Sequence, residues 1–547
     1  MATNIIMATE KYRDICLTSQ LIRSGSPAIF KLNPKTENIG ALVRLTIGDQ
    51  NVNTINKTIL LVGETGSGKS TLIDSLVNYA MGVTWEDDVW FKIVNDQKAP
   101  SAGQSSEEHN EPNQSESQTS EVIVYRIFGF EGKTLPYSLT IIDTPGYGDT
   151  KGIKKDDVIK EQLLDWFRSD NGINEINAVG LVMKSADNRL TDRLRYVFDS
   201  VVSLFGKNME QNIVALITHS DGLVPQDALK ALVNANIKCA KNEKRDPRHF
   251  LFNNRQMMER KEEDLFVLKF ASDFSKFQMD QFTKFIGKAS PQKLNTTVDV
   301  LNERNRLKSV IISLEERVQT IELQRRQITQ ERNILENCEK DMKNNKNYIE
   351  DVDEVYKEKK KIEGGRWGIL WLSYRGAMNC LKCEETCHHE GCIHATNPDD
   401  GCAVMEDGYC TVCTGKCPTE VHVKDTWIFV TKTKKVRKTK EDVKKKYEES
   451  KKDSEKHLSI LQLMEKKMDE YQREKDKWLD ESFQHIKNLE RIALNVDSLS
   501  TLVHLDFLIE RMEERNDRAK LQELKEMKKR ADKGASVAMG YMNKNKI

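Results

Sequence analysis

Short apolar runs followed by polar residues dominate the first half of the chain. The clearest are 58–62 (TILLV), 137–143 (YSLTIID) and 212–218 (NIVALIT), and 121–127 (EVIVYRI) is similar. Runs of this length, rich in Ile, Val and Leu, are typical of strands buried in a parallel sheet. An amphipathic stretch at 71–79 follows the first run and predicts a helix. The pattern predicts an α/β domain over 55–290, preceded by an N-terminal segment at 1–54.

A seven-residue apolar repeat replaces this pattern from Leu307 onward. Its members are Leu307, Leu314, Ile321, Ile328, Leu335, Met342, Ile349 and Tyr356. Ile311 and Val318 fill the second heptad position at first, and Arg325 and Arg332 fill it later. The repeat predicts a coiled-coil helix over 291–363.

A second charged helix is predicted over 441–497, with Leu461, Met464, Met468, Tyr471 and Trp478 on one face. The similar lengths favour an antiparallel hairpin with residues 364–440 at its far end. The alternative is a pair of solvated helices that associate only between chains. Residues 498–547 are predicted as a C-terminal helical segment and tail, amphipathic over 502–527.

Composition adds limits to this picture. A chain of 547 residues is too long for one core and predicts several domains. The 85 basic and 85 acidic residues balance, which gives no overall attraction to nucleic acid. There is no apolar run long enough to span a membrane, no signal peptide and no lipidation signal, so we expect a cytoplasmic protein.

The most specific chemistry lies directly after the first apolar run. Its residues match G-x-x-x-x-G-K-[ST] and are Gly63, Glu64, Thr65, Gly66, Ser67, Gly68, Lys69 and Ser70, followed by Thr71. A loop of this kind cradles phosphates with its backbone N–H groups, Lys69 reaches the β- and γ-phosphates and Ser70 is a ligand of Mg²⁺. The sequence therefore predicts a nucleoside triphosphate site.

Two later strand ends extend this site. Asp143 is expected to hold Mg²⁺, and Gly146 to donate its N–H to the γ-phosphate. Asp221 can accept both N1–H and N2–H of guanine, with His219 against the ring; a plain helix cap is the alternative. Asn253 and Asn254 follow another apolar run and can bring an amide to the base.

These residues resemble a group of GTPases. Thr144-Pro-Gly-Tyr-Gly-Asp149 resembles the second switch of septins. Phe252-Asn-Asn254 resembles the base-binding turn of the GTPase of immunity-associated protein (GIMAP) family. Thr218-His219 is similar to the chloroplast-import (Toc) GTPases. The resemblance implies a Ras-like P-loop fold that binds GTP or GDP with Mg²⁺ and forms homodimers across the nucleotide face. His219 stands where septins and GIMAPs have Lys, and Tyr147 where Ras-type enzymes have Gln. We therefore expect slow hydrolysis, raised by a partner or by self-association.

The first switch is harder to locate. Residues 97–120 are polar and without apolar period, which predicts disorder in the absence of nucleotide. Thr119 is the candidate for the switch threonine that closes on Mg²⁺. The residues expected to act in catalysis are then Lys69, Ser70, Thr119 and Gly146. Ser120 is a rival, and a plain flexible insertion is the alternative.

A cysteine-rich segment interrupts the two predicted helices. Cys380-x2-Cys383-x3-Cys387-x4-Cys392 recurs as Cys410-x2-Cys413-x3-Cys417-x4-His422. Two units with the same spacing predict about two structural Zn²⁺ ions, one per unit or interleaved between units. A disulfide framework is the alternative. The aromatic stretch 367–374 is interpreted as core of this module and the basic run 432–440 as the start of a helix.

Two functions remain in view. The first is a GTPase switch that dimerises and signals through the helical hairpin to an unknown partner at the zinc module. The second is a scaffold or adaptor that binds GTP structurally and uses its coiled coil and zinc module for protein contacts.

Overall fold

The computed structural model describes residues 11–39, 42–94, 122–144, 163, 166–167, 172–341, 349–362, 376–389, 402–439, 442, 445, 460–495 and 499–530. The chain divides into two compact units. Unit 1 comprises Met1–Leu301, Ile492–Leu502 and Lys528–Ile547, and unit 2 comprises Asn302–Arg491 and Val503–Met527.

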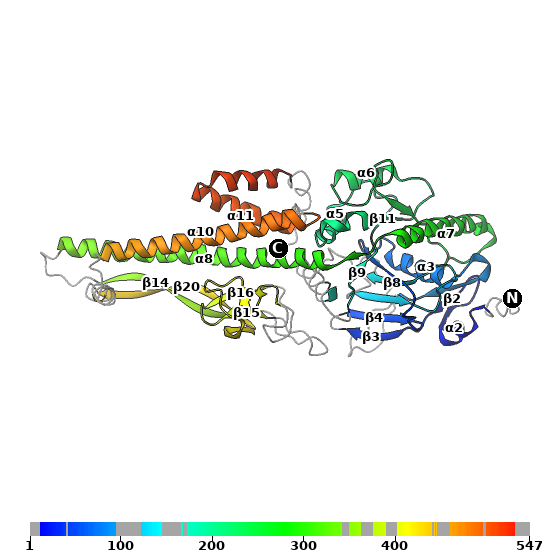
Figure 1. Ribbon diagram of the computed structural model, residues 1–547, viewed down its shortest axis with the longest axis horizontal. Helices are drawn as coiled ribbons and strands as arrows, with labels where there is room; N and C mark the ends of the chain where they lie inside the picture. The colour runs from blue at the N-terminus through cyan, green and yellow to red at the C-terminus, as the bar shows by residue number, and fades with distance from the viewer. Residues whose placement is uncertain are drawn as a thin grey trace. The chain divides into compact units, whose positions relative to one another are not determined.

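Unit 1 contains an eight-stranded sheet with the order β12-β11-β10-β5-β8-β7-β4-β3 (Figure 1). The strands are β3 (Lys35–Ile39), β4 (Leu42–Ile47), β5 (Asn56–Val62), β7 (Ile123–Ile127), β8 (Ser138–Asp143), β10 (Ala178–Lys184), β11 (Ile213–Thr218) and β12 (His249–Leu251). The five strands from β12 to β8 are parallel. Their carboxyl ends therefore meet at one edge of the sheet, and the predicted α/β fold is confirmed.

Part of the N-terminal segment belongs to this sheet. Strand β4 pairs parallel with β7, and β3 pairs antiparallel with β4. A second, three-stranded sheet contains β1 (Gln20–Arg23), β2 (Ala28–Lys31) and β6 (Val89–Lys92), after the short helix α2 (Arg13–Thr18). Residues before 55 thus extend the domain rather than only precede it.

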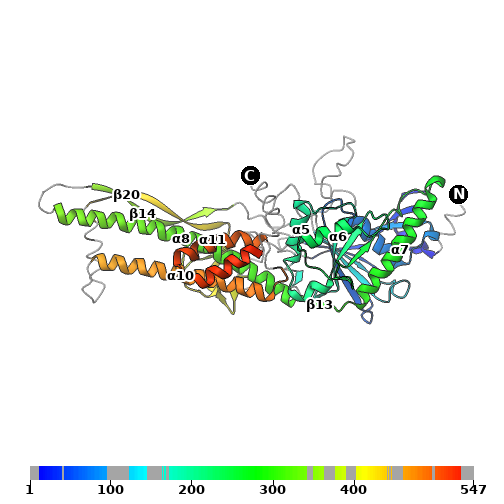
Figure 2. The same ribbon diagram turned by 90° about the horizontal axis from the view of Figure 1, so that it is seen from above.

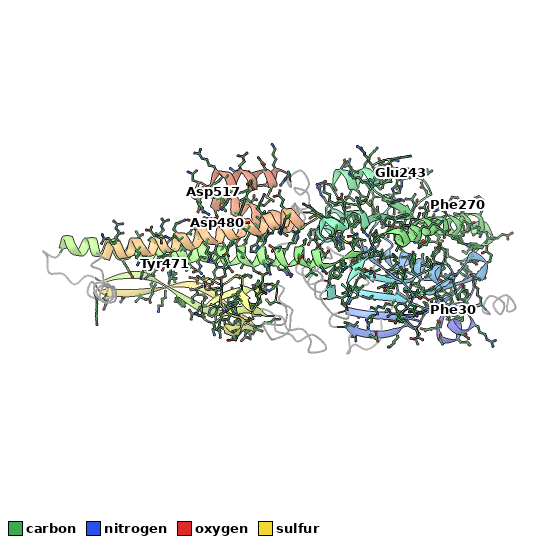
Figure 3. The ribbon with its side chains drawn as sticks, viewed as in Figure 1. Phe30, Glu243, Phe270, Tyr471, Asp480 and Asp517 are labelled. Carbon is green, nitrogen blue, oxygen red and sulfur yellow. The ribbon has the colours of Figure 1, made fainter. Side chains whose placement is uncertain are left out.

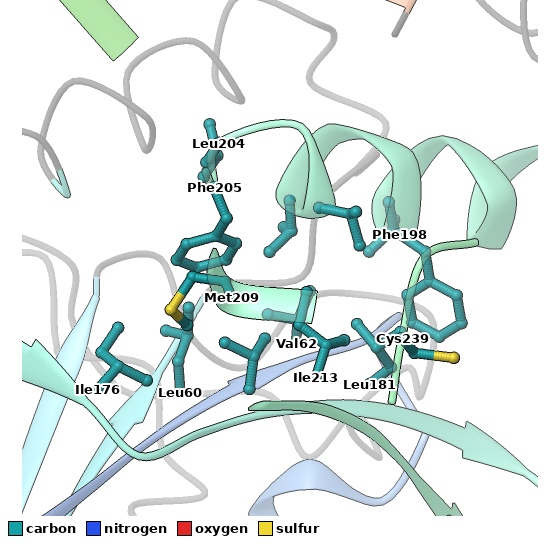
Figure 4. Packing of buried hydrophobic residues seen from close by; sticks show 14 of the residues in the cluster. Leu60, Val62, Ile176, Leu181, Phe198, Leu204, Phe205, Met209, Ile213 and Cys239 are labelled. Atoms are coloured by element: carbon teal, nitrogen blue, oxygen red, sulfur yellow. The ribbon is translucent and has the colours of Figure 1, made fainter. Parts of the chain in front are cut away.

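Helices complete the core of unit 1. They are α3 (Lys69–Met81), α5 (Asp192–Val202), α6 (Gln226–Asn234) and α7 (Leu265–Lys288). In Figure 4, Phe198 of α5 and Phe205 beyond it pack over Val62 and Leu181 of the sheet. Leu494 joins the same cluster, so the chain returns to this core near its C-terminal end.

Two long helices, α8 (Asn295–Asp341) and α10 (Ile460–Ile492), run antiparallel in unit 2. His485 pairs with Glu303 at 2.8 Å, and Arg317 with Glu474 at 3.2 Å, so residues later in α8 face residues earlier in α10. Heptad residues Leu307 and Leu314 are buried. The two helices therefore pair antiparallel within one chain, whereas a coiled-coil hairpin and a coiled coil between chains stay predictions.

The predicted extent of the first long helix is wrong. Helix α8 ends at Asp341, and heptad positions 349 and 356 lie in strand β14 (Ile349–Lys361). This strand pairs along its whole length with β20 (Trp427–Thr439). Cross-strand ion pairs join Lys432 to Glu358 and Lys434 to Glu354. Pairing with a distant basic strand therefore overrides the local heptad pattern, and most of the run 432–440 is strand rather than helix start.

The cysteine-rich module, residues 376–389 and 402–425, is not at the far end of a helical hairpin. The β14–β20 ribbon returns the chain along α8 (Figures 1 and 2). Ser313 Oγ donates to Thr386 O at 3.4 Å, Arg306 Nε to Ala403 O at 3.2 Å, and Lys416 pairs with Glu481 of α10 at 2.8 Å. The module therefore packs beside both helices. Its strands are β15 (Ala377–Cys380), β16 (Glu385–His388), β17 (Met405–Glu406), β18 (Tyr409–Cys410) and β19 (His422–Asp425).

The C-terminal helices cover α10. Arg515, the last residue of α11 (Leu499–Arg515), pairs with Asp480 at 2.6 Å, and Lys520 pairs with both Asp480 and Asp517. Figure 3 labels Asp480 on α10 and Asp517 beyond α11. Within the described residues, none of the helices is both long and apolar enough to cross a lipid bilayer.

Candidate nucleotide-binding site

The loop between β5 and α3 has the geometry that an anion requires. Gly68 is the N-cap of α3 and has φ of 91°, a left-handed conformation that favours glycine. A Cβ there would lie 3.2 Å from the Thr218 side chain. Ser70 and Thr71 follow in the first turn, where backbone N–H groups have no partner within the helix. The loop therefore presents N–H groups at the positive end of a helix.

Lys69 lies inside this loop. Its side chain is buried, and Nζ donates to Gly63 O at 2.7 Å and to Glu64 O at 3.1 Å. Burial lowers the pKa of Lys69, while the charges of Asp143 and Glu64 raise it. The ammonium group is thus held at the loop and electrostatically coupled to the end of β8.

Asp143 carries the most informative feature of the site. The residue is 0% exposed, and neither carboxylate oxygen has a hydrogen-bond partner among the described residues. Burial raises its pKa to about 6, and the charge of Lys69 opposes this rise. Buried carboxylates normally have partners. An Asp placed beside a phosphate loop in this way fits a Mg²⁺ ion, bound directly or through water.

Thr218 fastens the loop to the end of β11. Its hydroxyl donates to Ser67 O at 2.6 Å, and His219 Nδ1 lies 3.1 Å from that hydroxyl oxygen, Thr218 Oγ1. Burial, with the charges of Lys184 and Arg255, lowers the pKa of His219. The imidazole is therefore neutral at pH 7. The sequence identified Thr218 as a strand end and, with His219, as part of the resemblance to Toc GTPases. It did not predict the contact of Thr218 with the loop, because that contact is tertiary.

The four residues predicted to contact the base follow neighbouring strands. Ser220 N donates to Phe252 O at 3.0 Å, which brings the residues after β11 and β12 together. Asp221 is exposed, and its Oδ1 accepts from Leu223 N at 2.9 Å within a turn. This contact is not the helix cap named as the alternative, because Pro225 is the N-cap of α6. Asn253 N donates to Ser275 Oγ, and Asn254 Oδ1 is buried without a partner among the described residues.

A second cation near the loop was not anticipated. Arg193 in α5 lowers the pKa of Lys69 through its charge. Its Nε and Nη2 are buried and have no hydrogen-bond partner within the described part of the chain. The nearby Thr191 hydroxyl donates to Glu64 Oε1 at 3.0 Å. Arg193 lies in an amphipathic helix without a recognisable motif, so no sequence signal identified it.

Several predicted residues cannot be placed. Thr119, Ser120, Gly146, Tyr147, Cys392 and the stretch 367–374 lie outside the described residues. Their roles stay predictions.

The cysteine-rich module gathers its predicted ligands into two groups. Cys380, Cys383, Cys413 and Cys417 form one group, and Cys387, Cys410, Cys413 and His422 form the other. Each group takes residues from both sequence units, which is the grouping that interleaved metal sites would require. Such groups could hold metal ions.

Comparisons with solved structures give low overall similarity. Toc33 from Arabidopsis thaliana in complex with Mg²⁺ and GMPPNP is 16% identical, with 44% of this chain and 88% of that chain covered and a TM-score of 0.28. The septin GTPase domain from Chlamydomonas reinhardtii is 15% identical, with 42% and 94% covered and a TM-score of 0.21. LeoA, a bacterial dynamin GTPase from ETEC, is 13% identical, with 52% and 46% covered and a TM-score of 0.24. Values this low carry no argument about function.

Family models give the more specific result. The septin model matches residues 53–178, and the AIG1 family model matches residues 116–269. No curated protein matches the chain. The two matched ranges together contain the phosphate loop, Asp143, Asp221 and Asn253. This part of the chain is a P-loop GTPase domain that is similar to the septin and AIG1 families.

Proposed function

We propose that the protein is a guanine-nucleotide switch that hydrolyses GTP slowly and acts through nucleotide-dependent self-association. The observation that carries the proposal is the buried pair of partnerless Asp143 oxygens beside Lys69 in the phosphate loop. A buried carboxylate and a buried ammonium group at a helix N-terminus suit the Mg²⁺ and phosphates of a nucleoside triphosphate.

We propose roles for the phosphate-binding residues from the sequence motifs and, where the structure describes them, from their positions. The backbone N–H groups of 63–71 surround the β-phosphate. The Lys69 ammonium group gives up its hydrogen bonds to the carbonyl oxygens of the loop and donates to phosphate oxygens instead. Ser70, Asp143 and Thr119 are the residues that would hold Mg²⁺. When bound, Mg²⁺ neutralises charge that develops on the phosphate oxygens. Gly146 donates its N–H to the γ-phosphate, and water attacks that phosphate.

Base selection is proposed to rest on Asp221. Its carboxylate must leave the Leu223 N–H, or share it, to accept the two donors of guanine. His219 lies against the ring, and Asn253 and Asn254 close over it. Only guanine offers the paired donors, whereas adenine does not, so GTP is preferred to ATP.

The phosphate site is tested by Lys69→Ala. We expect GTP affinity to fall at least 100-fold, since the principal phosphate cation is lost. Lys230→Ala, at a lysine 70% exposed on α6, is the matched control and should bind as the wild type does. Calorimetric titration of GTP with Mg²⁺ measures both. Unchanged affinity in Lys69→Ala would remove the site assignment.

Base selection is tested by Asp221→Asn. An amide can pair with xanthine but not with guanine, so we expect weaker GTP binding and stronger xanthosine triphosphate binding. Asp227→Asn, at an exposed carboxylate of α6, is the control. Equal affinity of the wild-type protein for ATP and GTP would contradict the role of Asp221.

The cysteine-rich module is proposed to hold about two structural Zn²⁺ ions. The nine cysteines whose side chains the structure describes form no disulfides, which fits a metal site better than a disulfide framework. Metal bound there would replace the apolar core that so short a segment lacks. The module would then be a rigid surface for a protein partner.

A further inference from the structure

We propose that the cysteine-rich module holds a binuclear zinc centre in which the Cys413 thiolate bridges the two ions. This inference rests on the proposal that the bound metal is zinc. It adds that seven residues supply two complete tetrahedra, and that Cys392 is not needed. The ligands are Cys380, Cys383, Cys387, Cys410, Cys413, Cys417 and His422.

The grouping of ligand atoms is the first argument. Within each group the ligand atoms all lie within 4.8 Å of one another, and Cys413 is the one residue in both. Cys383 Sγ and Cys417 Sγ are 3.5 Å apart. Two sulfurs on one tetrahedral zinc, with Zn–S of about 2.3 Å, lie about 3.8 Å apart. A disulfide requires about 2.05 Å. The spacing fits sulfurs around an ion.

His422 supplies an independent argument. Its Nδ1 lies 2.9 Å from Pro418 O. Because a carbonyl oxygen only accepts, Nδ1 carries the proton and Nε2 carries the lone pair. That Nε2 is buried and has no hydrogen-bond partner among the described residues. A histidine that ligates zinc normally donates its other N–H in this way. The ring is therefore prepared to ligate through Nε2.

Backbone N–H groups are directed at the sulfurs. Cys410 Sγ accepts from Val412 N and Cys413 N, both at 3.3 Å, and Cys413 Sγ accepts from Cys417 N at 3.2 Å. Six thiolates around two Zn²⁺ ions leave a net charge of −2. Hydrogen bonds to sulfur delocalise this charge and tune such centres. The arrangement fits thiolates rather than a packed core of thiols.

The turn at Gly415 is shaped around one group. Its N–H donates to Cys383 Sγ at 3.3 Å. A Cβ at this position would lie 2.8 Å from Cys417 Sγ and 3.1 Å from Cys383 Sγ. Glycine therefore lets the backbone approach two sulfurs closely, which a packed turn without metal does not require.

Sharing of Cys413 distinguishes this centre from two separate sites. In two separate sites, Cys413 would serve only the group with Cys417, and Cys392 would complete the group with His422. Cys413 lies within reach of both groups, so each has four ligands without Cys392.

Metal content of the full-length protein tests the ligand set. Elemental analysis of purified wild type and Cys392→Ser should give about two zinc ions per chain. The Cys417→Ser variant should keep about one zinc ion per chain. The Cys413→Ser variant should keep fewer, since both sites lose a ligand. A loss of one zinc in Cys392→Ser, or equal losses in Cys413→Ser and Cys417→Ser, would overturn the bridge.

Cobalt substitution tests the bridge without any variant. After exchange of zinc for Co²⁺ in the wild type, ions joined by one sulfur couple their spins. The electron paramagnetic resonance signal at two equivalents should therefore account for less than half of the cobalt present. A signal that accounts for both ions refutes the bridge but leaves two zinc sites. Less than one zinc per chain refutes the zinc proposal itself.

Discussion

At the scale of single residues, the site combines groups that sequence patterns identify with groups they miss. Lys69 and Asp143 were predicted because each stands at a fixed place after a buried strand. Thr218 and Arg193 were missed as site residues because they reach the loop from distant elements. Asp221 was identified, but its contact with the Leu223 N–H was not predicted. Local patterns therefore predicted the chemistry of the loop, and tertiary contacts supplied its support.

The buried charge of Asp143 should make the nucleotide-free protein less stable near neutral pH. Its pKa of about 6 lies above the ordinary 3.8, so the folded state prefers the protonated form. The stabilisation from that proton is present at pH 4 and is lost as pH rises through 6. Asp143→Asn should therefore raise the free energy of unfolding by up to about 3 kcal/mol at pH 7, and by less at pH 5.

Urea unfolding of the nucleotide-free wild type, Asp143→Asn and the control Asp227→Asn at the two pH values measures this effect. Binding of GTP with Mg²⁺ to Asp143→Asn should be weakened at the same time. A gain in stability that is equal at pH 5 and pH 7 would contradict the account of Asp143.

Arg193 is the residue from which we expect a catalytic effect. Its partnerless N–H groups can stabilise charge on the phosphate oxygens as water attacks. Arg193→Ala should lower the rate of GTP hydrolysis at least tenfold and change GTP affinity little. Arg245→Ala, at an exposed arginine of the same unit, is the control. Single-turnover hydrolysis measures the effect, and an unchanged rate in Arg193→Ala would exclude this role.

At the scale of elements, the strands of unit 1 followed the apolar runs closely, whereas the long helix did not follow its heptads to the end. Positions 349 and 356 continued the repeat by coincidence, and the ribbon with β20 decided their structure. Strand β20 is rich in β-branched, aromatic and basic residues, and its basic side chains face acidic ones in β14. That pairing is visible only when two distant segments are considered together.

The buried part of the heptad seam should carry the stability of unit 2. Leu314 is 0% exposed in α8. Leu314→Ala should lower the free energy of unfolding of this unit by about 2–5 kcal/mol. Arg326→Ala, at an exposed position of the same helix, should change it little. Thermal unfolding followed by helical circular dichroism measures both, and equal behaviour of the two variants would contradict the buried seam.

At the scale of the whole molecule, the chain joins a GTPase domain to a helical unit that carries the cysteine-rich module. The sequence predicted both kinds of structure and the metal-ligand spacing. It placed the module at the end of a hairpin, because the strands that return it beside α8 were interpreted as helix. The proposed surface for a partner therefore includes the helices that the module packs against.

The protein is proposed to be a slow guanine-specific switch that acts through self-association. The release of phosphate tests this function. Release from GTP and from ATP is followed over a hundredfold range of wild-type protein concentration, with Lys69→Ala as the inactive reference. We expect slow release of phosphate from GTP at low protein concentration and a rate per molecule that rises with protein concentration. Little phosphate should be released from ATP. A rate per molecule that stays at the level of Lys69→Ala throughout, or equal release from ATP, would contradict it.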